Sequence, residues 1–110
     1  MKRKFVETPL FRRLLDQIGD SLLLERIQDE VKRNFETAPV IEGTGGARKV
    51  RVAKSESGKS GGYRVIYIDV PITETTYLLT IYDKRVRENI SNEVKSAIRV
   101  LVKKLKGDRE

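Results

Sequence analysis

The sequence predicts a single α+β domain spanning residues 1–110, with an N-terminal helical hairpin, a small antiparallel sheet of three to four strands and a C-terminal helix. Apolar residues recur at intervals of three and four near both ends of the chain, which is helical spacing. Between these ends, runs of β-branched and aromatic residues alternate with glycine-rich turns. A length of 110 residues suits one domain with one modest core.

The N-terminal part predicts a short strand and then two helices. Lys4 to Glu7 can form the strand, and Thr8, followed by a proline, is typical of a helix N-cap. Gly19 is a typical helix stop, and Asp20 or Ser21 is expected to cap the second helix. The two apolar stripes are Leu10, Phe11, Leu14, Leu15 and Ile18, and then Leu23, Leu24, Ile27, Val31 and Phe35.

The middle of the chain predicts three antiparallel strands. Pro39 ends the helical region, and Lys49 to Ala53 then alternates charged and apolar residues with the period of a half-buried strand. Tyr63 to Val70 and Thr76 to Tyr82 have the composition of central strands. Ser55 to Gly62 is expected to form a turn-rich connection that allows the first two strands to pair.

A last helix is expected to begin near Asn89 or Ser91. One face is apolar and the other is basic. We expect the basic face to be solvated and to complement the negative end of the helix dipole, and direct RNA contact is the less favoured alternative. The apolar face carries Ile90, Val94, Ile98, Leu101 and Leu105, and the basic face carries Lys95, Arg99, Lys103 and Lys106.

The composition excludes several kinds of chemistry. The chain has no cysteine and no histidine, which rules out disulfides, Cys-ligated zinc, and Ser-His-Asp or Cys-His catalysis. No apolar run is long enough to span a bilayer, and no signal-peptide pattern follows the charged N-terminus. We therefore expect a cytoplasmic protein that uses no metal, cofactor or membrane.

The formal charge of +7 indicates a polyanionic or acidic partner. Residues 1–42 hold eight basic and eight acidic side chains, whereas residues 43–70 hold six and two, and residues 71–110 hold nine and six. The positive excess therefore lies entirely in the downstream part, and it favours an anion-binding face there.

One segment has the form of a relaxed phosphate-binding loop. Ala53 to Ser60 reads Ala-Lys-Ser-Glu-Ser-Gly-Lys-Ser, with alanine in place of the first glycine. A true loop of this kind needs a helix to begin at the Lys-Ser pair, but here two glycines and a β-rich run follow. We interpret the segment as a cationic hairpin, in which Lys54 and Lys59 face solvent or contact a polyanion.

Several cations are expected to converge. Lys49 and Arg51 are two residues apart on a strand and so share a face. If the next strand pairs with theirs, the guanidinium of Arg64 can approach Arg51, and Lys84 and Arg85 can close the cluster from the end of the third strand. Such a concentration of positive charge is costly without a bound anion.

These residue types suit the cleavage of RNA. When a ribose 2′-hydroxyl attacks the adjacent phosphate, arginine can stabilise the negative charge of the phosphorane, and lysine can transfer the proton. Tyr82 or Tyr63 could stack on an exposed base, whereas Tyr67 and Tyr77 are expected to pack in the sheet. Arg48 is a further candidate for RNA contact.

Three segments in register resemble one protein family, the RelE/HigB branch of bacterial type II toxins within the RelE/ParE superfamily. They are Gly-Thr-Gly-Gly-Ala-Arg-Lys-Val-Arg (43–51), Gly-Lys-Ser-Gly-Gly-Tyr-Arg-Val-Ile-Tyr (58–67) and Tyr-Leu-Leu-Thr-Ile-Tyr-Asp-Lys (77–84). The order of the expected elements also resembles the RelE-like fold, so the resemblance covers nearly the whole chain.

The resemblance implies a metal-independent endoribonuclease that inhibits translation by cleaving mRNA in the ribosomal A site. It also implies a cognate antitoxin, with a helix-turn-helix DNA-binding domain, that holds the toxin inactive. Some relatives use a tyrosine in the final helical segment, but this chain has none after Tyr82, which is a candidate substitute. The residues that match the family's site are Lys49, Arg51, Arg64, Lys84 and Arg85.

Two other functions are compatible with these features. A toxin similar to the ParE branch would poison DNA gyrase without cleaving RNA, and would make the cation constellation incidental. A non-toxic RNA-binding module would use the same cations without catalysis. The antitoxin of either toxin should be acidic or amphipathic, since it must cover a basic or apolar surface.

Overall fold

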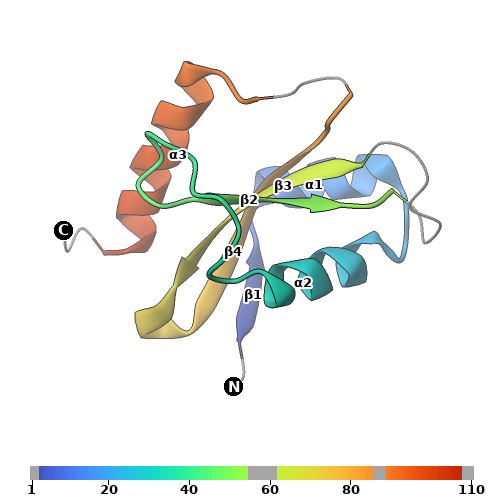
Figure 1. Ribbon diagram of the computed structural model, residues 1–110, viewed down its shortest axis with the longest axis horizontal. Helices are drawn as coiled ribbons and strands as arrows, with labels where there is room; N and C mark the ends of the chain where they lie inside the picture. The colour runs from blue at the N-terminus through green and yellow to red at the C-terminus, as the bar shows by residue number, and fades with distance from the viewer. Residues whose placement is uncertain (1–2, 55–61, 86–88, 108–110) are drawn as a thin grey trace.

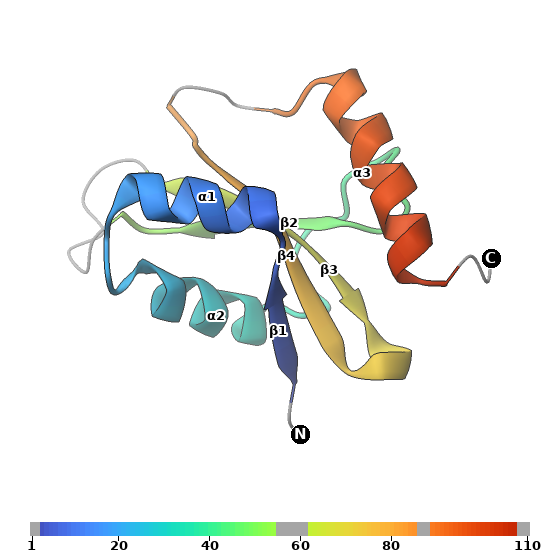
Figure 2. The ribbon, with the colours of Figure 1, turned by 180° about the vertical axis from the view of Figure 1, so that it is seen from behind.

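The computed structural model describes residues 3–54, 62–85 and 89–107, in which helices lie on both faces of one four-stranded sheet (Figures 1 and 2). The predicted α+β class is confirmed. No helix in these ranges is long and apolar enough to cross a membrane. The elements are β1 (Lys4–Glu7), α1 (Pro9–Ile18), α2 (Leu23–Arg33), β2 (Arg48–Val52), β3 (Tyr63–Val70), η1 (Pro71–Thr73), β4 (Thr75–Asp83) and α3 (Asn92–Leu105).

The strands are arranged in the order β1-β4-β3-β2. β2, β3 and β4 pair antiparallel as predicted, but β1 pairs parallel with β4, with Lys4 opposite Thr75. The expectation of a purely antiparallel sheet is therefore wrong for this strand. A strand of four residues carries no sequence signal of its direction, which is set here by α1, since α1 follows at once and packs against β4.

The ends of α1 are formed by the residues predicted for them. The backbone N–H of Phe11 donates to Thr8 Oγ1 at 3.3 Å, which is an N-cap bond. At the other end, Gly19 adopts a left-handed conformation with φ of 77°, and its N–H donates to the Leu15 carbonyl at 3.2 Å.

The caps of the other two helices differ. Ser91, one of the two residues expected to begin the last helix, accepts a bond from the Val94 N–H at 3.2 Å. Helix α2 instead has Leu22 at its N-cap, without a side-chain bond. The carboxylate of Asp20 accepts from the Leu22 N–H at 3.0 Å and pairs with Arg26 at 2.7 Å, so it stabilises the turn before the helix rather than the helix end.

Two apolar clusters lie on opposite faces of the sheet, because successive side chains of a strand point in opposite directions. The first cluster is formed by α1, α2 and one face of the sheet, and the second is formed by α3 and the other face (Figures 1 and 2). Members of the first include Phe11, Leu23, Ile27, Val31, Val50, Val52, Val65 and Leu78, and members of the second include Ile66, Ile68, Val70, Leu79, Ile98 and Val102.

Tyr67 lies in the first cluster and is fully buried. Its hydroxyl donates to the Asn34 carbonyl at 3.1 Å, and burial raises the pKa of this phenol. The packing role predicted for Tyr67 is confirmed. Tyr77 is partly buried against the second cluster, as also expected.

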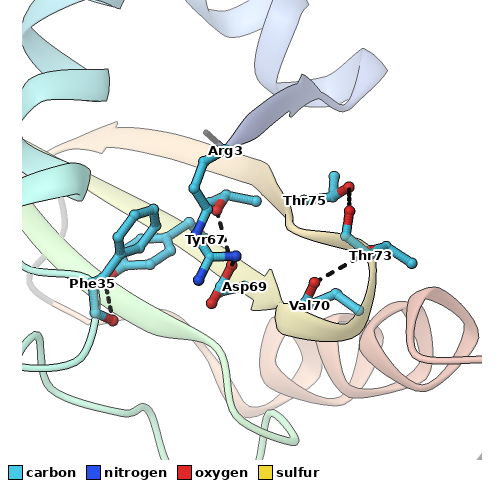
Figure 3. A network of polar contacts seen from close by, with 8 residues as sticks. Arg3, Phe35, Tyr67, Asp69, Val70, Thr73 and Thr75 are labelled. Carbon is cyan, nitrogen blue, oxygen red and sulfur yellow. Dashed lines mark hydrogen bonds and ion pairs between the residues drawn. The ribbon is translucent and has the colours of Figure 1, made fainter. Parts of the chain in front are cut away.

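A polar network fastens the N-terminus to the sheet and to the segment after α2 (Figure 3). Arg3 pairs with Asp69 at 2.7 Å, and its guanidinium lies 4.5 Å from the centroid of the Phe35 ring. The hydroxyl of Thr76 donates to the same Asp69 carboxylate at 3.1 Å. These contacts join three parts of the chain that are distant in sequence.

The glycine-rich segment before β2 forms a turn against α3. Gly46 has φ of +116°, a conformation that side chains rarely adopt, and a Cβ at Gly45 would lie 3.4 Å from the Val102 side chain. Thr44 is buried and accepts a bond from the Ala47 N–H at 3.1 Å. These glycines therefore shape a packed connection.

Candidate functional site

A polar row crosses three strands on one face of the sheet. Arg51 on β2 lies opposite Arg64 on β3, and Arg64 lies opposite Tyr82 on β4. Residues directly opposite one another on paired strands have Cβ atoms about 5 Å apart. Lys49 lies two residues before Arg51 and so shares this face. The strand pairing that the cation cluster requires is therefore present.

The second apolar cluster covers only the Tyr82 end of this row, because Tyr82 packs against the cluster and the two arginines lie beyond it. On β3, Ile66 and Ile68 lie on the same face as Arg64, and both belong to the cluster under α3. Arg64 lies beyond them and is only partly buried, and Arg51 is exposed. The same face of the sheet is thus apolar under α3 and cationic beyond it.

The Arg64 side chain has one unsatisfied polar atom. Its Nε is buried and has no hydrogen-bond partner among the described residues. Buried polar atoms in folded proteins are normally hydrogen-bonded, so an unpaired guanidinium N–H next to other cations is a candidate for an anionic ligand.

Two hollows flank Lys49. One has a volume of about 420 Å³ and is lined by Glu42, Lys49, Tyr82 and Lys95, among others. The second has a volume of about 390 Å³ and includes Lys49, Arg51 and Arg64 with Glu30 and Asn34 from the end of α2. Lys49 lines both hollows and is therefore central to this surface.

Two cations follow β4, and the second of them is held by the last residue of the strand. Arg85 donates its backbone N–H to the Asp83 carboxylate at 2.8 Å, and its Nε lies 3.7 Å from the same group. The backbone N–H of Lys84 donates to the Gly62 carbonyl at 3.1 Å, which ties this turn to the start of β3. Lys84 and Arg85 thus lie at the end of the sheet where the polar row crosses it.

Lys54 and Tyr63 do not join the polar row. Tyr63 is next to Arg64 on β3, so it lies on the opposite face, where it packs against the first apolar cluster. Lys54 pairs with Asp83 at 2.6 Å, and its Nζ lies 5.5 Å from the centroid of the Tyr63 ring. The bond from Lys54 is the main cause that lowers the pKa of Asp83, and the Arg85 N–H adds to it.

Arg48 is also separated from the row. It lies opposite Tyr67 on the helical-hairpin face, and its guanidinium donates to the Ala38 carbonyl at 2.5 Å. Lys59 lies outside the described residues. Of the sequence-predicted candidates, the structure brings together Lys49, Arg51, Arg64 and Tyr82, with Lys84 and Arg85 at the adjacent end of the sheet.

A comparison with known protein families identifies the chain. The family model described as the RelE toxin of the RelE/RelB toxin-antitoxin system matches residues 4–110. The chain belongs to the RelE toxin family. A RelE toxin is one half of a toxin-antitoxin system, so this chain has a cognate antitoxin as its partner.

A solved structure of Escherichia coli toxin RelE shares the fold. This is the free form of a variant with two arginine-to-alanine substitutions, and it matches with a TM-score of 0.57 and 15% sequence identity. The match covers 91% of this chain and 99% of the other. At this identity the match shows a common RelE fold.

The RelE fold adds one cation that the sequence pattern did not indicate. Lys95, on the basic face of α3, lines the same hollow as Lys49 and Tyr82. Only the way α3 folds back over the sheet brings Lys95 to this hollow, and helical spacing carries no such information.

The element that follows residues 53–60 is strand β3 and not a helix, which agrees with the rejection of a phosphate-binding loop.

The described residues of this RelE toxin contain no cluster of three or more His, Cys, Asp or Glu side chains that could hold a metal ion. Two carboxylates, Glu30 and Glu42, border the two hollows singly. Glu30 already accepts bonds from Arg33 and Asn34. The chemistry offered by the site itself is thus dominated by cations and by one tyrosine.

Proposed function

We propose that this RelE toxin is a ribosome-dependent mRNA endonuclease that cleaves mRNA in the ribosomal A site and thereby inhibits translation. The observation that carries the proposal is the row of Arg51, Arg64 and Tyr82 with Lys49 beside it, which begins at the border of the apolar cluster under α3 and runs away from it. The buried and unpaired Nε of Arg64 supports an anionic ligand at this place.

In the proposed reaction, the ribose 2′-oxygen attacks the adjacent phosphorus and loses its proton to a base. The bond from phosphorus to the 5′-oxygen breaks, and that oxygen takes up a proton. The products are a 2′,3′-cyclic phosphate and a 5′-hydroxyl. This displacement needs no metal or other cofactor, because cationic side chains can stabilise the additional negative charge of the phosphorane.

Arg51 and Arg64 are assigned to the phosphorane oxygens. They lie directly opposite each other on paired strands, so both guanidinium groups can reach one phosphate. Arginine suits this role because its planar group forms two parallel hydrogen bonds to phosphate. Lys84 and Arg85 are assigned to the flanking RNA backbone, since they lie at the same end of the sheet.

Lys49 and Tyr82 are assigned to proton transfer and to positioning of the base. Both line one hollow, so a nucleotide seated there would contact both side chains. An aromatic ring at this position can stack on an unpaired base, which is a common way to hold single-stranded RNA. Lys95 lines the same hollow and is assigned to a phosphate contact.

Primer extension on translated mRNA tests the proposal. Wild-type toxin should produce new 5′ ends within the translated region, and Arg64→Ala should reduce their yield about 100-fold or more, in the range found when one transition-state hydrogen-bond donor is removed. Arg99→Ala is the matched control, since Arg99 is exposed on α3 and lines neither hollow. It should cleave like the wild type.

Circular dichroism should show that both variants are folded before they are compared. EDTA should leave cleavage intact when ribosome integrity is maintained by a separate control. If Arg64→Ala cleaves mRNA like the wild type, the assignment of Arg64 to the phosphorane oxygens is wrong. If the wild type produces no new ends but inhibits supercoiling by DNA gyrase, the protein acts like the ParE branch and the proposal is wrong.

A further inference from the structure

Asp83 is an acidic residue at the border of the cationic surface. It is the last residue of β4, and Lys84 and Arg85 follow it directly. A carboxylate beside cations that bind phosphate repels the phosphate, and it can also form an ion pair that takes one of those cations away. The partners of the Asp83 carboxylate therefore decide whether the cations beside it are available.

The strand register places Asp83 on the face opposite the polar row. Asp83 lies opposite Tyr63 on β3, and Tyr63 packs against the first apolar cluster. The preceding residue, Tyr82, faces the other side, where it lies opposite Arg64. The Asp83 carboxylate is therefore directed away from the row, although the chain reaches Arg85 only two residues later.

Lys54 holds the carboxylate on that face. Its Nζ pairs with Asp83 Oδ2 at 2.6 Å and lies 5.5 Å from the centroid of the Tyr63 ring, so the side chain crosses β3 to reach the end of β4. The backbone of Lys54 is fixed as well, since its carbonyl accepts a bond from the Arg26 guanidinium at 2.7 Å. Arg26 also donates to Asp20 at 2.7 Å. Both the backbone and the ammonium group of Lys54 thus have defined partners.

The two oxygens of the Asp83 carboxylate have different partners. Oδ2 binds Lys54, whereas Oδ1 accepts the Arg85 backbone N–H at 2.8 Å and lies 3.7 Å from Arg85 Nε. The Arg85 side chain is 65% exposed, and an exposed ion pair of this length contributes little to stability. The backbone of Arg85 is therefore fixed by Asp83, while its guanidinium remains available to another anion.

We propose that Lys54 is a positioning residue that keeps the Asp83 carboxylate occupied, so that the Arg85 guanidinium stays free to bind an RNA phosphate. The inference rests on the proposed function, which assigns Arg85 to the RNA backbone. Without Lys54, the Arg85 guanidinium is the remaining ion-pair partner of this carboxylate among the described residues. It would then pair with Asp83 and be withdrawn from RNA. Lys54 thus acts through Asp83 rather than by contact with RNA.

The salt dependence of RNA binding tests the proposal. The probe is a short single-stranded RNA with 2′-O-methyl groups, which lacks the attacking hydroxyl, and its affinity is measured by fluorescence anisotropy at several salt concentrations. For single strands, the slope of log affinity against log salt decreases in magnitude by about 0.7 for each phosphate contact that is lost. Arg85→Ala and Lys54→Met should therefore each reduce the slope by about 0.7, although Lys54→Met retains the arginine.

A second substitution separates positioning from direct contact. In Lys54→Met/Asp83→Asn no carboxylate is left to capture Arg85, and the amide oxygen of asparagine can still accept the Arg85 N–H. The double variant should recover the wild-type slope, and Asp83→Asn alone should have at least that slope. Lys32→Met is the matched control, because Lys32 is exposed on α2 and lines neither hollow. It should bind like the wild type.

A wild-type slope in Lys54→Met, or a reduced slope that Asp83→Asn does not restore, would overturn the proposal. A wild-type slope in Arg85→Ala would also overturn it, because Arg85 would then not bind RNA. In these cases new mRNA ends made by the wild type would still support the proposed function. If Lys54→Met does not fold, a reduced slope in Asp83→Asn would contradict the proposal. A wild type that makes no new ends would contradict the proposed function and this inference with it.

Discussion

The two faces of strands β2 and β3 use the same residue types in opposite ways. On the face covered by the helical hairpin, Arg48 bonds to a backbone carbonyl and Tyr63 packs beside Lys54. One residue further along each strand, Lys49 and Arg64 face the other side, where Lys49 lines both hollows and Arg64 lines one of them. Residue type alone therefore does not decide whether a cation is structural or functional. The partners that the fold supplies decide it.

The cationic face, formed by Lys49, Arg51 and Arg64, can stay positively charged because the stability of the fold comes from elsewhere in the molecule. The neighbouring residues under α3 are apolar, and the opposite face of the sheet is a well-packed core. The buried Nε of Arg64, which has no hydrogen-bond partner among the described residues, is then available for an external anion. Substitutions on the hairpin face should change stability, and substitutions on the cationic face should change activity.

The largest expected change in stability comes from the core behind the cationic face. Ile27 is fully buried on α2, and Ile27→Ala should lower the free energy of unfolding by about 2–5 kcal/mol because it leaves a cavity. Urea denaturation measures this loss. Cleavage per folded molecule should remain at the wild-type level. A strong loss of cleavage under conditions in which the variant is fully folded would show that the two faces are coupled.

A pair of adjacent substitutions tests the comparison directly. Arg48→Ala should cost about 1–3 kcal/mol of stability, since it leaves the carbonyl of buried Ala38 without its donor. Lys49→Ala should change stability by less than about 0.5 kcal/mol, as is usual for surface positions. Lys49→Ala should nonetheless reduce cleavage about 100-fold or more if lysine transfers the proton. Urea midpoints and primer extension measure the two effects, and the reverse pattern would contradict the division of faces.

The smallest effect is a pH-dependent one at the end of the sheet. The pKa of Asp83 is lowered in the folded state by Lys54 and by the Arg85 N–H, so its charged form stabilises the fold. This stabilisation is fully present above the unfolded pKa of about 3.9 and disappears as the pH falls through the lower folded pKa.

Asp83→Asn should therefore unfold at a lower urea concentration than the wild type at pH 7, and the gap between the two should close as the pH is lowered below about 4. A gap of equal size at pH 7 and pH 3 would show that the carboxylate charge has no role in this turn.

Much of the fold could be predicted from local patterns. Thr8, Gly19 and Ser91 mark helix ends by their own hydrogen bonds or backbone conformation, and the strands follow from β-branched runs. The parallel pairing of β1 could not be predicted, because it depends on how α1 packs against β4. Local patterns carry no information about such distant contacts.

The site was predictable to the extent that it depends on strand alternation. Lys49 and Arg51 share a face for this reason, and the pairing of Arg51 with Arg64 follows from the connection between their strands. Alternation also predicts that Tyr63 and Arg64 point to opposite faces, so their separation could be predicted from the sequence. The position of Lys95 beside Lys49 could not be predicted, because it depends on where α3 crosses the sheet.

The parallel pairing of β1 with β4 has a consequence for the synthesis of this protein. Residues 4–7 are synthesised before their partners at 75–78, which are added some seventy residues later. Since the chain is synthesised at roughly 5–20 residues per second, the first strand remains unpaired for several seconds. The fourth strand completes both the sheet and the row that ends at Tyr82. A nascent chain therefore cannot assemble this row until Tyr82 has been translated.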